Sequence, residues 1–156
     1  MRMPPRINSM VACALALLMV VCADLAHAVR DLIVAQPVTH NVLRFDGQTG
    51  APKGVFIAAG TGGLNSPAQM ILGPDGKLYI ADSVANIIKR FDLDGYFNDN
   101  FTPAGYLSAP VSLKFGPDGK LYVLCSGTVR QIHRFNGATG AHEGIAVDTT
   151  ATRMSS

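Results

Sequence analysis

The sequence contains no tryptophan and little charge, and these shortages exclude several protein classes. Charged residues make up 15% of the 156 residues, against about 25% in an average globular protein. So low a share excludes a disordered polyelectrolyte, a coiled coil and a charged helical bundle. Sixteen glycines and nine prolines lie between short apolar runs, which indicates a turn-rich β protein of at most one domain.

The chain also lacks a concentrated patch of basic residues. The formal net charge is +2, and the lysines and arginines are scattered singly. A scattered charge of this size does not dominate binding to a polyanion, so nucleic acid and anionic membranes are excluded as expected partners. A protein or a small polar ligand is the class of partner that is left, and the sequence does not identify it.

Residues 1–28 have the three parts of a secretory signal peptide. Arg2 and Arg6 precede an apolar run from Met10 to Ala23, and Ala26-His27-Ala28 supplies the small residues of a cleavage site. As a helix the run is about 21 Å long, short of the ~30 Å hydrocarbon core of a bilayer. We therefore expect no stable membrane span, a mature chain that begins near Val29, and a secreted or periplasmic location.

Cysteine pairs and catalytic motifs are absent from the expected mature chain. Cys13 and Cys22 fall in the signal peptide, so Cys125 remains alone and is expected to be a small buried apolar residue. There is no Gly-x-Ser-x-Gly, no phosphate-binding loop and no His-Glu-x-x-His. The remaining histidines, His40, His133 and His142, are interpreted as surface or packing residues.

Internal repeats are the strongest feature of the chain. The seven residues Gly73 to Tyr79 recur unchanged from Gly116 to Tyr122, and Arg-Phe-Asp or Arg-Phe-Asn occurs at Arg44, Arg90 and Arg134. The expected mature chain is therefore almost three copies of one unit.

Each copy has the texture of a β-sheet, with apolar segments of five to seven residues bounded by Gly, Pro, Asp or Asn. The middle copy predicts four strands, at residues 68–72, 78–81, 87–91 and 96–101. Four antiparallel strands in about 44 residues are one blade of a β-propeller. We predict an all-β partial β-propeller of about three blades, the first lacking its innermost strand. Its expected bounds are 29–58, 66–101 and 109–147, with a polar C-terminal tail at 148–156.

The pattern of each copy resembles NHL repeats. It runs Pro-x-x, three apolar residues, Gly-Pro-Asp-Gly-Lys-Leu-Tyr, an apolar residue and Ala-Asp-Ser, then Asn-x-Ile-x-Arg-Phe-Asp. It is also similar to the gluconolactonase-like and streptogramin-lyase-like six-bladed propellers of the TolB-like kind. The resemblance implies a six-bladed ring, and such blades serve binding proteins and enzymes alike.

Three blades do not close a ring, because a propeller typically needs at least four. Two hypotheses stay open: a homodimer in which three blades plus three make six, or a truncated gene product that lacks its other blades. Nothing at either terminus has the character of an interface, which favours truncation.

Chain direction predicts that the loops between second and third strands, and those between blades, share the face around the channel mouth. The expected ligand-binding residues there are Asn65, Ser66, Asp82, Ser83, Asn86 and Ser126. Structural turn residues are expected on the opposite face, at Asp75, Gly76, Asp118 and Gly119.

The gluconolactonase-like relatives imply a divalent ion at the channel mouth, held by Asp, Asn and Glu side chains. Asp82 and Asn86 are the only candidates here for a cation such as calcium, and no matching Glu exists. The preferred hypothesis is therefore an exported binding or interaction module with no cofactor and no identifiable catalytic chemistry. The alternative is a propeller-type hydrolase or lyase whose metal site is completed by dimerisation.

Overall fold

Three antiparallel β-sheets follow one another along the chain in the computed structural model, which describes residues 31–128 and 130–148. The expected signal peptide with Cys13 and Cys22, and most of the C-terminal tail, lie outside the described residues. Within the described ranges no helix is long and apolar enough to cross a bilayer.

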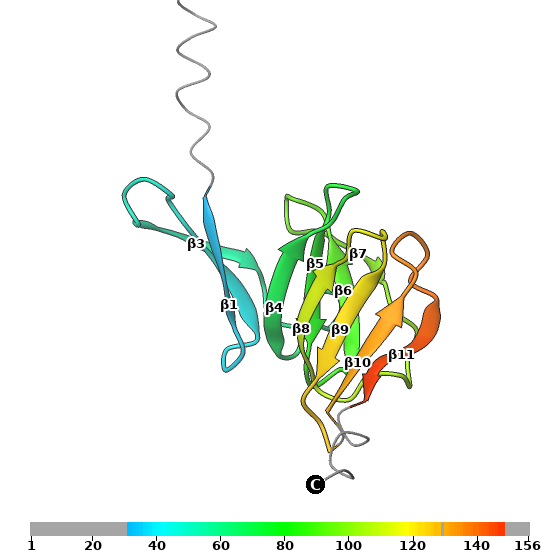
Figure 1. Ribbon diagram of the computed structural model, residues 1–156. Coiled ribbons are helices and arrows are strands. Elements are labelled where there is room, and N and C mark those ends of the chain that lie inside the picture. Colours follow the sequence, from blue (N-terminus) through cyan, green and yellow to red (C-terminus); the bar gives the residue numbers. More distant parts are fainter. Residues whose placement is uncertain (1–30, 129, 149–156) are drawn as a thin grey trace, which may run out of the picture.

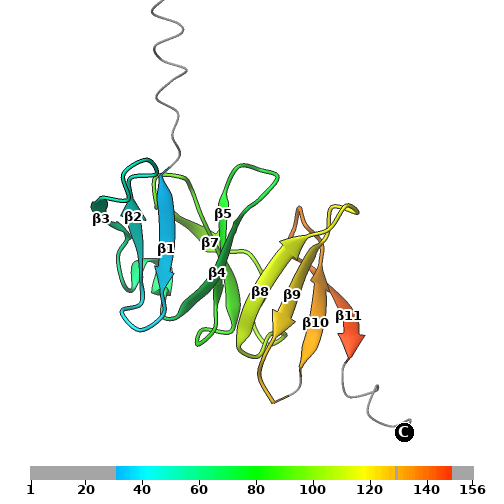
Figure 2. The same ribbon diagram turned by 60° about the vertical axis from the view of Figure 1, so that its left-hand side comes forward.

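Each sheet is one blade, and the three blades stand side by side (Figures 1 and 2). Blade 1 has the strands β1 (Leu32–Gln36), β2 (Asn41–Phe45) and β3 (Pro52–Ile57). Blade 2 has β4 (Pro67–Leu72), β5 (Leu78–Asp82), β6 (Ile87–Phe91) and β7 (Phe97–Asn100), and it follows the short 3-10 turn η1 (Thr61–Gly63). Blade 3 has β8 (Pro110–Phe115), β9 (Leu121–Cys125), β10 (Gln131–Phe135) and β11 (His142–Asp148).

The predicted fold class is confirmed, including the shortened first blade. Blades 2 and 3 each have four strands in the order of the chain, whereas the sheet of blade 1 begins at β1. Among the described residues, blade 1 has no strand equivalent to β4 and β8.

The repeated heptapeptide forms the first hairpin of blades 2 and 3. In blade 2 the Asp75 carboxylate accepts a hydrogen bond from the Lys77 N–H at 3.1 Å and another from the Tyr79 hydroxyl at 3.0 Å. Gly76 follows at φ 75°, a backbone conformation that a glycine adopts without strain. The Asp118 turn of blade 3 repeats the arrangement, with the Tyr122 hydroxyl at 2.9 Å.

Alternation along each central strand divides its side chains between two apolar cores, because successive residues point to opposite faces of a sheet. Leu78 and Ile80 of β5 pack toward blade 1, whereas Tyr79 and Ala81 pack toward blade 3. Blade 3 directs Leu121, Val123 and Cys125 of β9 back toward blade 2, and Cys125 is buried as expected. We call the opposite side of blade 3 its forward face.

The forward face of blade 3 repeats the chemistry of the covered face of blade 2. Tyr122 and Leu124 stand at the repeat positions of Tyr79 and Ala81. Tyr79 is 1% exposed, but Leu124 is 38% exposed because the described chain ends with this blade. One face of blade 3 therefore carries blade-contact residues with no blade against it among the described residues.

Gly140 is a position where an added methyl group should disturb the contact between blades 2 and 3. A Cβ there would lie 1.8 Å from the Phe101 carbonyl oxygen, and its φ is +72°. Gly50 holds the equivalent turn of blade 1 at φ +70° with nothing within 4 Å. We expect Gly140→Ala to lower the free energy of unfolding by about 3 kcal/mol or more and Gly50→Ala by about 1 kcal/mol. Equal losses in urea unfolding would contradict this packing.

Candidate functional site: the loop face

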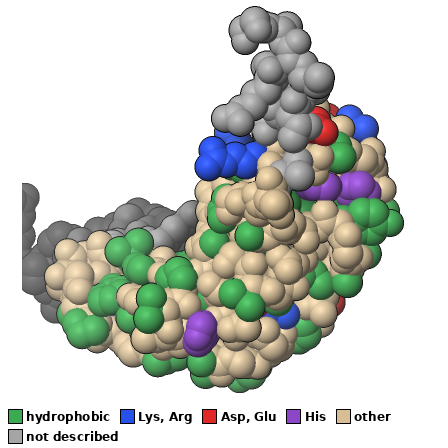
Figure 3. Space-filling view, turned by 90° about the horizontal axis from the view of Figure 1, so that it is seen from below, with side chains coloured by type: hydrophobic (Ala, Val, Ile, Leu, Met, Phe, Trp, Pro, Cys, Tyr) green, Lys and Arg blue, Asp and Glu red, His purple; other side chains and the backbone are tan. Residues whose placement is uncertain are grey.

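The loops at one end of the blades form a single face, which Figure 3 shows from below. We define this loop face by the connecting residues 37–40, 58–66, 83–86, 101–109, 126–128 and 130. Few Lys, Arg, Asp or Glu side chains appear on it, and most of its surface is hydrophobic, uncharged or backbone (Figure 3). Its charge is therefore low, as the composition of the chain suggests.

Asp82 ends β5 just beneath the loop face and is fully buried. Its carboxylate accepts hydrogen bonds from the backbone N–H groups of Asn65 at 2.9 Å, Ser66 at 3.0 Å and Ala85 at 3.0 Å. Three backbone donors satisfy a buried carboxylate without a cation. Asp82 thus connects the loop that enters blade 2 with the loop between β5 and β6.

Ser83, Asn86 and Ser126 also bond to loop backbone. The Ser83 hydroxyl donates to the Ser66 carbonyl at 3.2 Å, and the Ser126 hydroxyl donates to the Ala109 carbonyl at 3.2 Å. Asn86 has a φ of 57°, and its side-chain oxygen accepts the Ala109 N–H at 2.7 Å. The six residues predicted as ligand contacts therefore fall into two hydrogen-bonded groups, one within blade 2 and one between blades 2 and 3.

These contacts also test whether Asp82 and Asn86 fit a divalent ion. A calcium site needs six to eight oxygen ligands. Both carboxylate oxygens of Asp82 and the amide oxygen of Asn86 already accept backbone N–H groups. Among the described residues there is no group of three or more His, Cys, Asp or Glu that could hold a metal. In this arrangement the two side chains do not fit a metal ion. Metal binding at Asp82 and Asn86 therefore rests on the sequence prediction alone.

Blade 3 replaces the Asp82 carboxylate with the Cys125 thiol. The two positions are 43 residues apart, the period of the repeat, and both side chains are buried. Burial raises the pKa of the Cys125 thiol, which therefore stays protonated at neutral pH. Blade 3 therefore carries a neutral thiol where blade 2 carries a carboxylate that is hydrogen-bonded to three backbone N–H groups.

Sequence reasoning missed Lys89, which is 4% exposed in β6. Its ammonium donates to the Gly62 carbonyl at 2.7 Å and to the Asn100 side-chain oxygen at 3.2 Å. Burial lowers the pKa of this lysine. The lysine fastens η1 to blade 2 and so positions the loop that carries Asn65 and Ser66. Lys89 lies two residues from both Ile87 and Phe91, and residues two apart in a strand point to the same face. This spacing from two apolar residues was the signal that could have identified it as inward-facing.

A second feature missed by sequence reasoning is a pair of histidines between β10 and β11. Nδ1 of His133 lies 3.1 Å from Nε2 of His142, and the ring of His142 stacks on Tyr106 at 4.1 Å. Burial, and secondarily the neighbouring His142, lower the pKa of His133. The imidazole is therefore held neutral inside the fold.

The depressed pKa of His133 predicts a loss of stability in mild acid. The unfolded chain binds a proton at this histidine below about pH 6.5, whereas the folded chain resists it, so the free energy of unfolding falls as pH drops from 7 through that value. We expect His133→Gln to reduce this fall in urea unfolding between pH 7 and 5. Equal slopes in wild type and His133→Gln would contradict the prediction.

The tips of two loops present apolar side chains to solvent. Val38 is 86% exposed and Val84 is 57% exposed. They occupy the same repeat position, 46 residues apart, each two residues before a left-handed residue, His40 or Asn86. The left-handed turn holds each valine outward, so the loop face has two equivalent apolar points.

No protein-family model matches the chain, and no curated protein matches it. Solved structures do. The first is that of a nidogen/laminin complex, with a TM-score of 0.63 and 18% sequence identity over 78% of this chain and 45% of the other. The second is a gluconolactonase from Xanthomonas campestris, with a TM-score of 0.57 and 17% identity over 78% of this chain and 44% of the other.

The fold is that of a β-propeller. Both similar structures have propeller folds, and at this identity the likeness shows the fold alone. The chain spans less than half the length of either one. The three sheets of this chain therefore correspond to part of a propeller.

Proposed function

We propose that this chain is an exported propeller module of NHL-type blades that binds a partner through its loop face. The observation that carries the proposal is the pair of exposed valines on a face with little charge. The loops that form the face contain no carboxylate, and Asp82 beneath them is buried. Exposed apolar side chains among uncharged polar groups are typical of a protein-binding surface rather than of a site for charged substrates.

A protein is the proposed class of partner. One of the similar structures is a nidogen/laminin complex, a complex between proteins, and this gives the class independent though distant support. Asn65, Asn86 and Ser126 are exposed in loops of the same face, and Ser83 is half-buried beside Val84. They would supply a polar rim around an apolar centre.

Association of two chains through their end blades is part of the same proposal. The forward face of blade 3 carries Tyr122 and Leu124, and the free side of blade 1 carries Leu32, which is 58% exposed. These residues stand at repeat positions that are buried between blades 2 and 3 or between blades 1 and 2. A second copy would cover both faces and bring two loop faces into one ring.

A capture experiment with two matched variants tests the loop face. Val38→Asp/Val84→Asp places charge on both tips, and Tyr96→Asp places charge on the opposite end of blade 2, where Tyr96 is 71% exposed. Proteins cross-linked to the wild type from the extracellular fraction of its source should be lost with the valine double variant and kept with Tyr96→Asp. Equal capture by all three proteins would contradict a binding role for the loop face.

A further inference from the structure

Among the described residues, the inner edge of blade 1 lacks a strand that the other two blades have. In blade 2 the Lys77 carbonyl accepts the Gly73 N–H at 2.8 Å, and the Ser83 N–H donates to the Ser66 carbonyl at 2.9 Å. The direction of the backbone N–H and C=O groups alternates along a strand. Those of Tyr79 and Ala81, which lie between Lys77 and Ser83, therefore also point toward β4. Blade 1 has Ile33 and Ala35 at those positions, and β2 is the only strand that pairs with β1 in the described chain.

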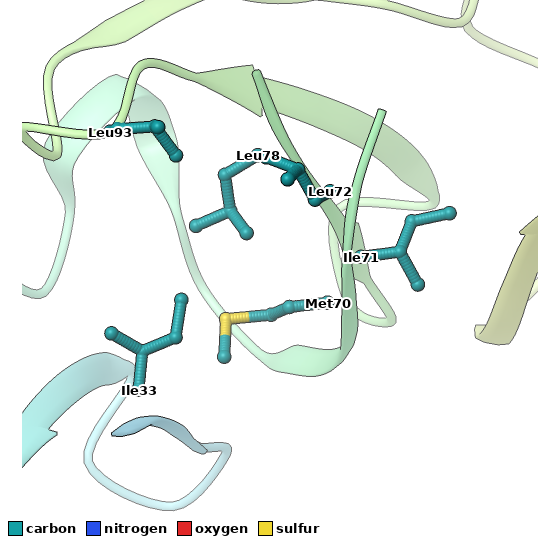
Figure 4. Close-up of a pocket in the computed structure, with 6 residues that line it drawn as sticks. All are labelled: Ile33, Met70, Ile71, Leu72, Leu78 and Leu93. Carbon is teal, nitrogen blue, oxygen red and sulfur yellow. The ribbon is translucent and has the colours of Figure 1, made fainter. Parts of the chain in front are cut away.

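An apolar cavity of about 510 Å³ lies beside this free edge. Ile33, Met70 and Leu78 point into it from β1, β4 and β5, with Leu93 beyond them (Figure 4). Leu72 also lines the cavity and is 56% exposed. The space lies against the side of β4 that faces blade 1, and no strand among residues 31–128 and 130–148 covers it there.

Blade 2 shows what a strand would place in such a cavity. Ile71 of β4 is paired with Tyr79 and packs against the core between blades 2 and 3. Figure 4 shows Ile71 pointing away from Ile33 and Met70. A strand beside β1 would put its Ile71 equivalent next to Ile33, with its side chain in the cavity.

We propose that the edge of β1 accepts an extended segment of another polypeptide, which pairs antiparallel with β1 and fills the cavity with an aliphatic side chain. This binding mode is β-strand addition, in which backbone bonds give affinity and a side-chain pocket gives selectivity. The two inner strands of the chain define the segment, since each starts with proline, at Pro67 and Pro110, and ends before Gly-Pro-Asp-Gly. Residues 21–30, directly before β1, contain neither feature. This site is separate from the loop face and goes beyond the proposed function.

The probe is a capped peptide of residues 66–73, Ser-Pro-Ala-Gln-Met-Ile-Leu-Gly, titrated into the full chain by calorimetry. Saturable binding of one peptide per chain is expected. Methylation of the Ile71 backbone nitrogen, or Ile71→Asp in the peptide, should weaken binding at least about tenfold, because each removes a backbone donor or the buried side chain. A peptide of residues 109–116 carries Lys114 at that position and should also bind at least about tenfold more weakly.

A protein variant separates this site from displacement of the chain's own inner strands. Ala35→Pro removes one N–H from the free edge of β1, and proline is tolerated on edge strands. It should abolish peptide binding with little change in Tm, while Val38→Asp/Val84→Asp should bind the peptide as the wild type does. Binding that survives N-methylation or Ala35→Pro, or no binding at millimolar peptide, would overturn the proposal.

Discussion

Tyr79→Ala is expected to lower the free energy of unfolding by about 3 to 5 kcal/mol, the range for a large aromatic side chain removed from a core. The ring is 1% exposed between blades 2 and 3. It packs edge to face with Phe101 and Phe115, whose ring centroids lie 4.9 Å and 5.1 Å from its own. Its hydroxyl donates to the Asp75 carboxylate. Its loss would leave a cavity where two blades meet.

Tyr122→Ala is the matched control, because Tyr122 has the same place in the repeat and the same bond to its turn aspartate. It lies on the forward face of blade 3 and should cost less than about 1 kcal/mol in urea unfolding of dilute protein. At high concentration the same variant should weaken association of the chains. Similar losses for Tyr79→Ala and Tyr122→Ala in dilute protein would contradict the assignment of the two faces.

Asp82→Ala is expected to lower the free energy of unfolding by about 2 to 4 kcal/mol in the absence of any metal. Three backbone N–H groups would lose their acceptor, and each buried donor left unpaired costs about 1 to 3 kcal/mol, less where water reaches it. Ser83→Ala is the control, since it removes one hydroxyl bond to the Ser66 carbonyl and should cost under about 1 kcal/mol.

Asp82→Ala also distinguishes an aspartate that has a structural role from one that binds a metal. We expect calcium, magnesium and manganese to leave the Tm of the wild type unchanged, because Asp82 and Asn86 already bond to backbone N–H groups. A metal-dependent rise in Tm that disappears in Asp82→Ala would instead support the propeller-type hydrolase or lyase hypothesis.

The fold could be predicted because its information is local and repeated. Identical turns at Asp75 and Asp118 set two hairpins, and the spacing of the repeat then placed the remaining strands. The described strands of blade 2 agree with the predicted ones within one residue, because hairpin turns fix the register of the strands that they join.

The candidate site was predictable only as a set of loops. Asp82 was recognised as a polar residue at the end of a strand, but its acceptor role depends on backbone N–H groups 16 and 17 residues earlier in the chain. Lys89 and the His133–His142 pair likewise depend on contacts between elements. Such contacts follow from how the strands and blades pack, which the pattern of a single repeat does not contain.

Both end blades carry the chemistry of a blade-to-blade contact, and the absolute mass of the chain in solution shows whether those faces pair. Light scattering behind a sizing column should give the mass of two chains for the wild type. Leu124→Asp, on the forward face of blade 3, should give the mass of one. A wild type that stays a folded monomer at millimolar concentration would contradict the claim, because its two end faces would then be stable in water without a covering blade.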